Sequence, residues 1–164
     1  MSRPRTQPKS LRSDAHKLIG TCAGWNSRVA ARRITQFLDR ELAESGLTVA
    51  QIGLMALIAS ATDDTLGALA RRAGFEQSTL SRNLRILERD NLVEITTVQV
   101  DQRRRAVWLT ETGARQLERA IPLWRKAHAK LARRLAPELS KRLASATDVL
   151  IPRPSPPLGA ERVG

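Results

Sequence analysis

The sequence predicts a mainly α-helical protein that carries one small β-hairpin. Apolar residues recur at spacings of three and four over most of residues 11–150, which is typical of helices that bury one face. Only residues 92–110 depart from this pattern, because β-branched and polar residues alternate there in two short runs. With 164 residues, the chain is long enough for one domain with a hydrophobic core and too short for two independent domains.

The chain is strongly basic, with 28 Lys and Arg against 16 Asp and Glu, which gives a net charge of +12. This excess favours a polyanionic partner, nucleic acid before a membrane surface, because Lys and Arg displace the counterions condensed on phosphates. The longest apolar run, residues 52–61, is too short to span a bilayer, and no signal-peptide core follows the basic N-terminus. We expect a cytoplasmic protein, and the single Cys22 provides no disulfide framework.

The first third of the chain predicts an arm followed by helices. Residues 1–10 combine prolines with Arg and Lys and predict a disordered basic arm. Residues 11–46 are strong helix formers without proline, which predicts one long helix, or two nearly joined, ended by Gly46. Thr48 and Gln51 then make a Thr-x-x-Gln capping box at the start of a helix that is apolar on most sides and should be buried.

Residues 65–90 contain two short helices joined by a tight turn. Gly74 ends the first helix, because glycine most easily adopts the positive φ found there. In the second helix Leu80, Leu84 and Leu87 form one apolar stripe, and the opposite face offers hydroxyls and guanidiniums from Ser78, Ser81, Arg82, Arg85 and Arg89. Such a pair is the helix-turn-helix signature, whose second helix enters the DNA major groove. The alternative is a solvated basic face, which is typical of an isolated surface helix.

The second half predicts a hairpin and two more helices. After Asn91, a residue that tolerates the left-handed conformation, two β-rich runs at residues 92–100 and 106–110 flank DQRRR and predict a hairpin with a basic tip. Residues 110–135 predict a helix whose apolar positions follow a heptad pattern, typical of helices that pack along their length: Leu117, Ile121, Trp124, His128, Leu131 and Leu135. Pro137 starts a final helix, and the proline-rich residues 152–164 predict a disordered tail.

Three strings occur in a specific order and spacing: GLTVAQ, TLGALARRAGFEQSTLSRNLRILERDNLVE and DQRRRAVWLTETG. On these strings, residues 14–145 resemble the MarR family of winged helix-turn-helix transcription factors. The resemblance implies that residues 47–110 form a winged DNA-binding lobe flanked by dimerisation helices in residues 11–46 and 111–151. It also implies a homodimeric repressor that binds a palindromic operator and releases it when a small-molecule effector binds.

The resemblance places the contacts to double-stranded DNA on two elements. The candidates in the major groove are Ser78, Thr79, Ser81, Arg82 and Arg85. Arg103 is the candidate in the minor groove, and Asp101 is its orienting partner through a charge-assisted hydrogen bond. Arg104 and Arg105 strengthen the attraction to phosphates. The first strand of the wing departs from the family, because it lacks the basic residues often found there.

The resemblance also implies an effector site for a small aromatic ligand between the dimerisation helices and the winged lobe, with Cys22, Trp25, Leu54 and Met55 as candidates. Cys22 is interpreted as a packing residue, because it lies mid-helix, away from the positive charge or helix N-terminus that activates a thiol. A redox-sensing regulator acting through Cys22 is one alternative function. A nonspecific, architectural nucleic-acid-binding protein without an effector is another. We expect no enzyme, metal or cofactor, since no phosphate loop, metal-ligand cluster or nucleophile with a base is evident.

Overall fold

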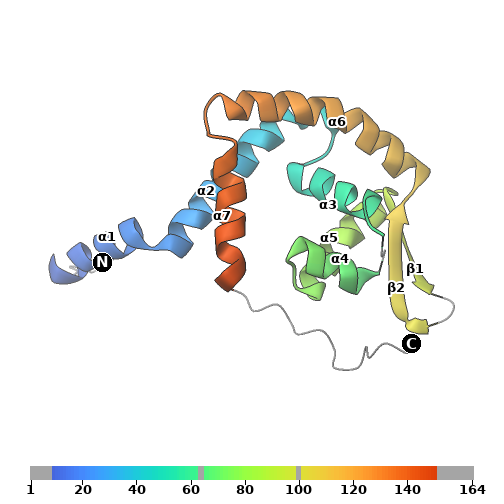
Figure 1. Cartoon of the computed structure of the whole chain (residues 1–164), viewed down its shortest axis with the longest axis horizontal. Coiled ribbons are helices and arrows are strands. Elements are labelled where there is room, and N and C mark those ends of the chain that lie inside the picture. Colours follow the sequence, from blue (N-terminus) through green and yellow to red (C-terminus); the bar gives the residue numbers. More distant parts are fainter. Residues whose placement is uncertain (1–8, 63–64, 99–100, 151–164) are drawn as a thin grey trace, which may run out of the picture. The chain divides into compact units, whose positions relative to one another are not determined.

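The structure is a computed structural model that describes residues 9–62, 65–98 and 101–150. It divides into two compact units, Met1–His128 and Ala129–Gly164. The helices are α1 Lys9–Thr21, α2 Ala23–Glu41, α3 Val49–Ala59, α4 Leu66–Ala73, α5 Gln77–Arg89, α6 Glu111–Ala132 and α7 Glu138–Thr147 (Figure 1). Two short 3-10 helices, η1 Ala43–Ser45 and η2 Asp148–Leu150, and an antiparallel hairpin of β1 Val93–Val98 and β2 Asp101–Leu109 complete the described elements. The predicted fold class is confirmed.

The N-terminal helices are two nearly joined helices and not one. Cys22 lies between them in an extended conformation, and its Sγ accepts a hydrogen bond from the Trp25 amide at 3.4 Å. The expected mid-helix position of Cys22 is therefore wrong: it is the N-cap of α2. Gly20 and Gly24 flank it and are poor helix formers, which explains the break. Helix α1 already starts at Lys9, inside the expected arm, and residues 1–8 lie outside the described residues.

The connection from α2 to α3 is fixed by local hydrogen bonds. Gly46 takes the left-handed conformation with φ 70° after η1. The predicted capping box is confirmed: the Gln51 amide donates to Thr48 Oγ1 at 3.2 Å, and the Thr48 amide donates to Gln51 Oε1 at 2.9 Å. The Asp39 carboxylate accepts from the Val49 amide at 2.7 Å and so ties α2 to the start of α3. Three otherwise unpaired amides at the helix start thus have partners.

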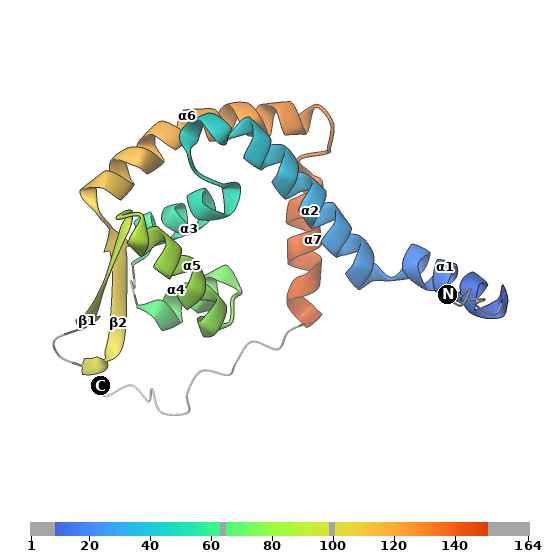
Figure 2. The ribbon, with the colours of Figure 1, turned by 180° about the vertical axis from the view of Figure 1, so that it is seen from behind.

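The hydrophobic core lies mainly in the lobe formed by α3, α4, α5 and the hairpin, which pack side by side in both views (Figures 1 and 2). The side chains with almost no exposure are Leu42, Met55, Leu69, Leu80, Leu84, Leu87 and Val107. Helix α3 is only partly buried, contrary to the prediction: its large residues Ile52, Leu54, Met55 and Ile58 are buried, whereas the small residues Ala50, Gly53, Ala56 and Ala59 are exposed. An isolated bridge from Thr65 to Ala106 joins the start of α4 to β2. Among the described residues, no polar or charged side chain is buried in this core.

The N- and C-terminal helices expose apolar side chains. All described side chains of α1 are exposed, and α7 contains no buried residue. Of the thirteen large apolar residues exposed in the described structure, only Phe75, Ile86 and Trp108 belong to the lobe. Within the described ranges, no helix is both long and apolar enough to cross a membrane.

Candidate DNA-reading surface

A tight turn sets the angle between α4 and α5. Gly74 ends α4 with φ 65°, and its amide donates to the Arg71 carbonyl at 3.3 Å. The Phe75 amide donates to the Ala70 carbonyl at 3.0 Å, so that the last carbonyls of α4 have partners. Glu76 is the N-cap of α5, which starts at Gln77. The predicted helix-turn-helix is therefore present, with its turn at the predicted glycine.

Helix α5 has one fully buried face and one polar face. Leu80, Leu84 and Leu87 are completely buried, which fixes the rotation of the helix about its axis. Of the residues predicted to contact DNA from this helix, four are exposed: Ser78, Thr79, Arg82 and Arg85. The fifth, Ser81, is half-buried. No described residue pairs with the guanidinium of Arg82 or Arg85, whereas Arg89 lies 3.4 Å from the Asp90 carboxylate. The face thus presents two unpaired cations beside two hydroxyls.

The hairpin differs from the prediction in the bounds of its strands. Asp101, Arg103, Arg104 and Arg105 belong to β2. Val98 pairs with Asp101 after a register shift that follows Thr97, so no residue of β1 pairs with Gln102, Arg103 or Arg104, and these residues lie at the end of the hairpin where the basic tip was predicted. The predicted boundaries of the strands were wrong: β1 ends at Val98 instead of residue 100, and β2 begins at Asp101 instead of residue 106. The connecting residues 99–100, and the side chains of Asp101, Arg103 and Arg104, lie outside the described residues. The proposed contact between Asp101 and Arg103 stays a prediction. Arg105 is exposed and pairs with Thr97 across the strands.

A compact joint connects the end of α5, the base of the wing and the start of α6. Asn91 has φ 55°, the left-handed conformation predicted for it. The Thr110 hydroxyl donates to the Asn91 carbonyl at 2.7 Å and accepts from the Gly113 amide at 2.9 Å. The Thr110 amide donates to the Leu92 carbonyl at 3.1 Å. Gly113 packs so closely on Leu92 that a Cβ added to it would lie 1.9 Å from the Leu92 carbonyl oxygen. Sequence reasoning assigned no role to Thr110 or Gly113, although both lie in the string LTETG.

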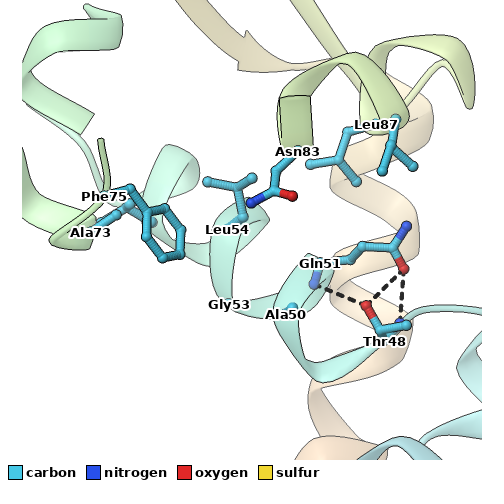
Figure 3. Close-up of a pocket in the computed structure, with 11 residues that line it drawn as sticks. Thr48, Ala50, Gln51, Gly53, Leu54, Ala73, Phe75, Asn83 and Leu87 are labelled. Carbon is cyan, nitrogen blue, oxygen red and sulfur yellow. Dashed lines mark hydrogen bonds between the residues drawn. The ribbon is translucent and has the colours of Figure 1, made fainter. Parts of the chain in front are cut away.

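A cavity of about 570 Å³ lies behind α5, between α3 and the end of α4. In Figure 3, Leu54 of α3, Phe75 of the turn, and Asn83 and Leu87 of α5 line it, and the Asn83 amide extends from α5 toward α3. Most of the wall is apolar, and Asn83 and Gln51 contribute polar groups. Phe75 and Ile86 line the cavity and are partly exposed. Both are large apolar residues among polar neighbours in the sequence, and this pattern is the signal that could have indicated the site.

The four effector candidates are not brought together. Leu54 lines the cavity, whereas Met55, its neighbour in the chain, is completely buried in the core. Trp25 is 54% exposed on α2, and neither it nor Cys22 lines the cavity. Because Cys22 caps α2, a helix N-terminus does lie beside its thiol, contrary to the premise used for it. Its role, packing or oxidant sensing, stays a prediction.

Some heptad positions of α6 are exposed to solvent and others are buried. Leu117 is buried, but Ile121 and Trp124 are exposed. The Trp124 and His128 rings lie with centroids 4.2 Å apart, and burial lowers the pKa of His128. The helix runs on through Pro122 and ends at Ala132, three residues before the predicted end. No group of three or more potential metal ligands occurs among the described residues.

Comparisons with known proteins agree with this architecture. The MarR family model matches residues 45–104. The M. tuberculosis transcriptional regulator MosR in complex with DNA is 35% identical, with 79% of this chain and 96% of that chain covered and a TM-score of 0.72. MosR in a second structure is 34% identical, with 80% and 97% covered and a TM-score of 0.67. No curated protein matches the sequence significantly.

More distant structures share the fold. A variant of E. coli MarR complexed with operator DNA is 22% identical, with 82% of this chain and 98% of that chain covered and a TM-score of 0.68. The sequence identity of 35% to MosR extends over 96% of the MosR chain, which indicates a common family and not only a common fold. The chain belongs to the MarR family of winged helix-turn-helix transcriptional regulators.

Proposed function

We propose that this chain is a dimeric repressor that reads a palindromic operator through α5 and is released by a small ligand. The observation that carries the proposal is the exposed face of α5, where Arg82 and Arg85 have no partner among the described residues. Arginine donates two parallel hydrogen bonds to guanine in the major groove, and the hydroxyls of Ser78 and Thr79 suit bases or phosphates. The MosR, MepR and MarR structures that contain DNA support the same use of this fold here.

Replacement of Arg82 by alanine tests base reading. We expect operator affinity to fall by about 1–3 kcal/mol, with sequence preference relaxed at one or two base pairs, because alanine cannot make the bidentate hydrogen bonds. The measurement is binding to duplexes selected from a random pool and to their single-base variants. Arg89→Ala is the matched control on the same helix, because Arg89 already pairs with Asp90. Equal weakening of every sequence by Arg82→Ala would instead favour a nonspecific architectural protein.

The dimer is proposed from the helical ends. Ten of the thirteen exposed large apolar residues lie outside the lobe, on α1, α2, α6, α7 and η2. A helix as short as α1, with 13 residues, is marginally stable in water, so its exposed apolar side chains favour a partner. A second copy supplies the same exposed surfaces in a symmetric interface. Two α5 helices, about one DNA turn (roughly 34 Å) apart, would then read the two halves of a palindrome.

The cavity behind α5 is the proposed effector site. A ligand in it would touch Asn83, Ile86 and Leu87, which belong to the same helix as Arg82 and Arg85. Binding therefore changes the position of the reading helix without contact to DNA, and it weakens the operator complex if the two states differ in ligand affinity. The mostly apolar wall, with the side-chain amides of Asn83 and Gln51, suits a small aromatic molecule that carries one or two polar groups.

Filling the cavity tests this role. Gly53 lines it, and a Cβ there would meet nothing within 4 Å, so Gly53→Leu places a side chain in the cavity from an unobstructed position on α3. Using anilinonaphthalene sulfonate as the probe, we expect its affinity to fall about tenfold, since burial of its apolar surface would stabilise the complex by roughly 1.4 kcal/mol less. Operator affinity without the probe should stay unchanged. Equal probe binding by wild type, Gly53→Ala and Gly53→Leu would place the effector elsewhere.

A further inference from the structure

The excess positive charge of this chain does not lie in the lobe that reads DNA. Residues 42–109 contain eight basic and eight acidic residues. Residues 1–41 contain nine basic and three acidic residues, and residues 110–164 contain eleven and five. The whole excess of twelve is therefore carried by the helical ends and the terminal segments. Binding of one operator by α5 and the wing leaves this charge unexplained.

Part of the charge forms a stripe along α6. Arg115, Arg119 and Lys126 are spaced by four and seven residues, which places them on one side of the helix, and all three are exposed. Leu117 and Trp124 of the heptad pattern fall on the other side. The basic stripe is thus separate from the apolar surface proposed for the dimer, and both can be used at once.

The stripe borders a hollow of about 700 Å³ between η1 and α6. Arg115 and Arg119 line it together with the hydroxyl-bearing Thr112 and Ser45. Arg115 pairs with Glu111, whereas no described residue pairs with Arg119 or Lys126. Glu44 also lines the hollow and reduces its positive potential. The unpaired cations of the stripe are therefore Arg119, at the hollow, and Lys126, beyond it.

A second pair of cations lies on α2. Arg28 and Arg32 are one turn apart, exposed, and without a partner among the described residues. Three of these four unpaired cations are arginines, whose planar guanidinium matches phosphate oxygens better than an ammonium does. Uncompensated charge of one sign destabilises a compact protein by self-repulsion, and a dimer joined through these helices would double it. A polyanion bound to them would remove that cost.

We propose that the exposed cations of α6 and of α2 form a second phosphate-binding surface, with one patch on each helix, which binds the backbone of duplex DNA without reading its sequence. On α6 the cations lie opposite the exposed apolar positions, whereas an interfacial helix needs them beside its apolar face, so α6 fits duplex DNA better than a membrane. On α2, Arg28 and Arg32 lie on the side of the exposed Trp25, so for this pair the choice between DNA and a membrane rests on the competition experiment below. Closely spaced backbone phosphates suit cations distributed along a helix, with a separation of about 10 Å between Arg119 and Lys126 from the rise per residue. The regulator then holds DNA in two ways, by sequence through α5 and by charge through the helical ends.

The test compares two fourfold variants in binding to a duplex that lacks the operator. The first neutralises the surface with Arg28→Gln, Arg32→Gln, Arg119→Gln and Lys126→Gln. The control keeps the charge with Arg28→Lys, Arg32→Lys, Arg119→Lys and Lys126→Arg. We expect the neutral variant to bind about tenfold or more weakly at 50 mM salt, and its plot of log affinity against log salt to flatten by about 0.9 for each phosphate that it no longer neutralises. The control should retain the wild-type slope.

Three outcomes decide between the possibilities. An unchanged slope and affinity in the neutral variant, with a wild-type thermal unfolding curve, would overturn the proposal. Stronger competition by poly-glutamate or by anionic phosphatidylserine vesicles than by duplex DNA would overturn the assignment to nucleic acid. If the wild type showed no preference for an operator, the proposed repressor function would be contradicted. The comparison of the two fourfold variants would still be valid, because its duplex contains no operator.

Discussion

Replacing Gly113 by alanine is expected to destabilise the protein by about 2–4 kcal/mol, although alanine is the better helix former. The added Cβ would lie 1.9 Å from the Leu92 carbonyl oxygen, 2.8 Å from its carbonyl carbon and 3.1 Å from its Cα. All three atoms are backbone, so no side-chain rotation relieves the overlap. Alanine gains only about 0.5–1 kcal/mol over glycine in a helix, whereas overpacking against a fixed backbone costs more.

The position of the overlap explains why a larger effect than usual is expected. Leu92 and Thr110 are held together by the Thr110 amide, and the Thr110 hydroxyl bonds both the Asn91 carbonyl and the Gly113 amide. Moving α6 away from Leu92 would break these hydrogen bonds as well. We expect the operator affinity of the folded fraction to fall too, because α5 ends at this joint.

The matched control is Gly53→Ala in α3, where a Cβ would meet nothing within 4 Å. There the helix propensity acts alone and should stabilise the protein by about 0.5–1 kcal/mol. Urea unfolding followed by circular dichroism measures both variants. If Gly113→Ala were as stable as the wild type, the close approach of α6 to Leu92 would be wrong.

Features set by local chemistry could be predicted from the sequence. The capping box at Thr48, the left-handed Gly74 and Asn91, and the three buried leucines of α5 all follow from neighbours within one or two helical turns. These signals locate the helix-turn-helix to within a residue or two. The exposed face of α5 follows from them, because burial of one face determines which side chains remain outside.

Features set by long-range packing could not be predicted from the sequence. The boundary of β2 depends on pairing with β1, so the DQRRR string resembled a turn although Arg105 pairs with Thr97. The cavity needs residues from α3, α4 and α5, and its wall includes Leu54 but not the adjacent Met55. Cys22 was assigned to a helix interior because its extended backbone conformation leaves no mark in the apolar spacing. Charge was also misleading, since the basic excess that indicated DNA lies outside the reading lobe.

Replacing Trp124 by arginine is expected to raise the dissociation constant of the proposed dimer about 100-fold or more. Trp124 is 38% exposed, although its ring lies against the tilted ring of His128 in the middle of the heptad pattern. A symmetric interface contains the residue twice, so two charges would enter apolar surface, at a cost of about 1–3 kcal/mol each. Sedimentation at micromolar concentration gives the mass, and operator binding should weaken with it, because one lobe reads only half of a palindrome.

Trp108→Arg separates the interface from a general effect of exposed tryptophan. Trp108 has the same exposure, 38%, but lies in β2 opposite Glu94, where an arginine gains an oppositely charged neighbour across the strands. This variant should keep the wild-type mass. A wild-type protein that is a stable folded monomer would refute the dimer itself, and an unaffected Trp124→Arg dimer would move the interface away from α6. Since α6 starts at the Gly113 joint, the helix proposed to join two copies is also tied to Asn91, just after each reading helix, through the Thr110 hydroxyl.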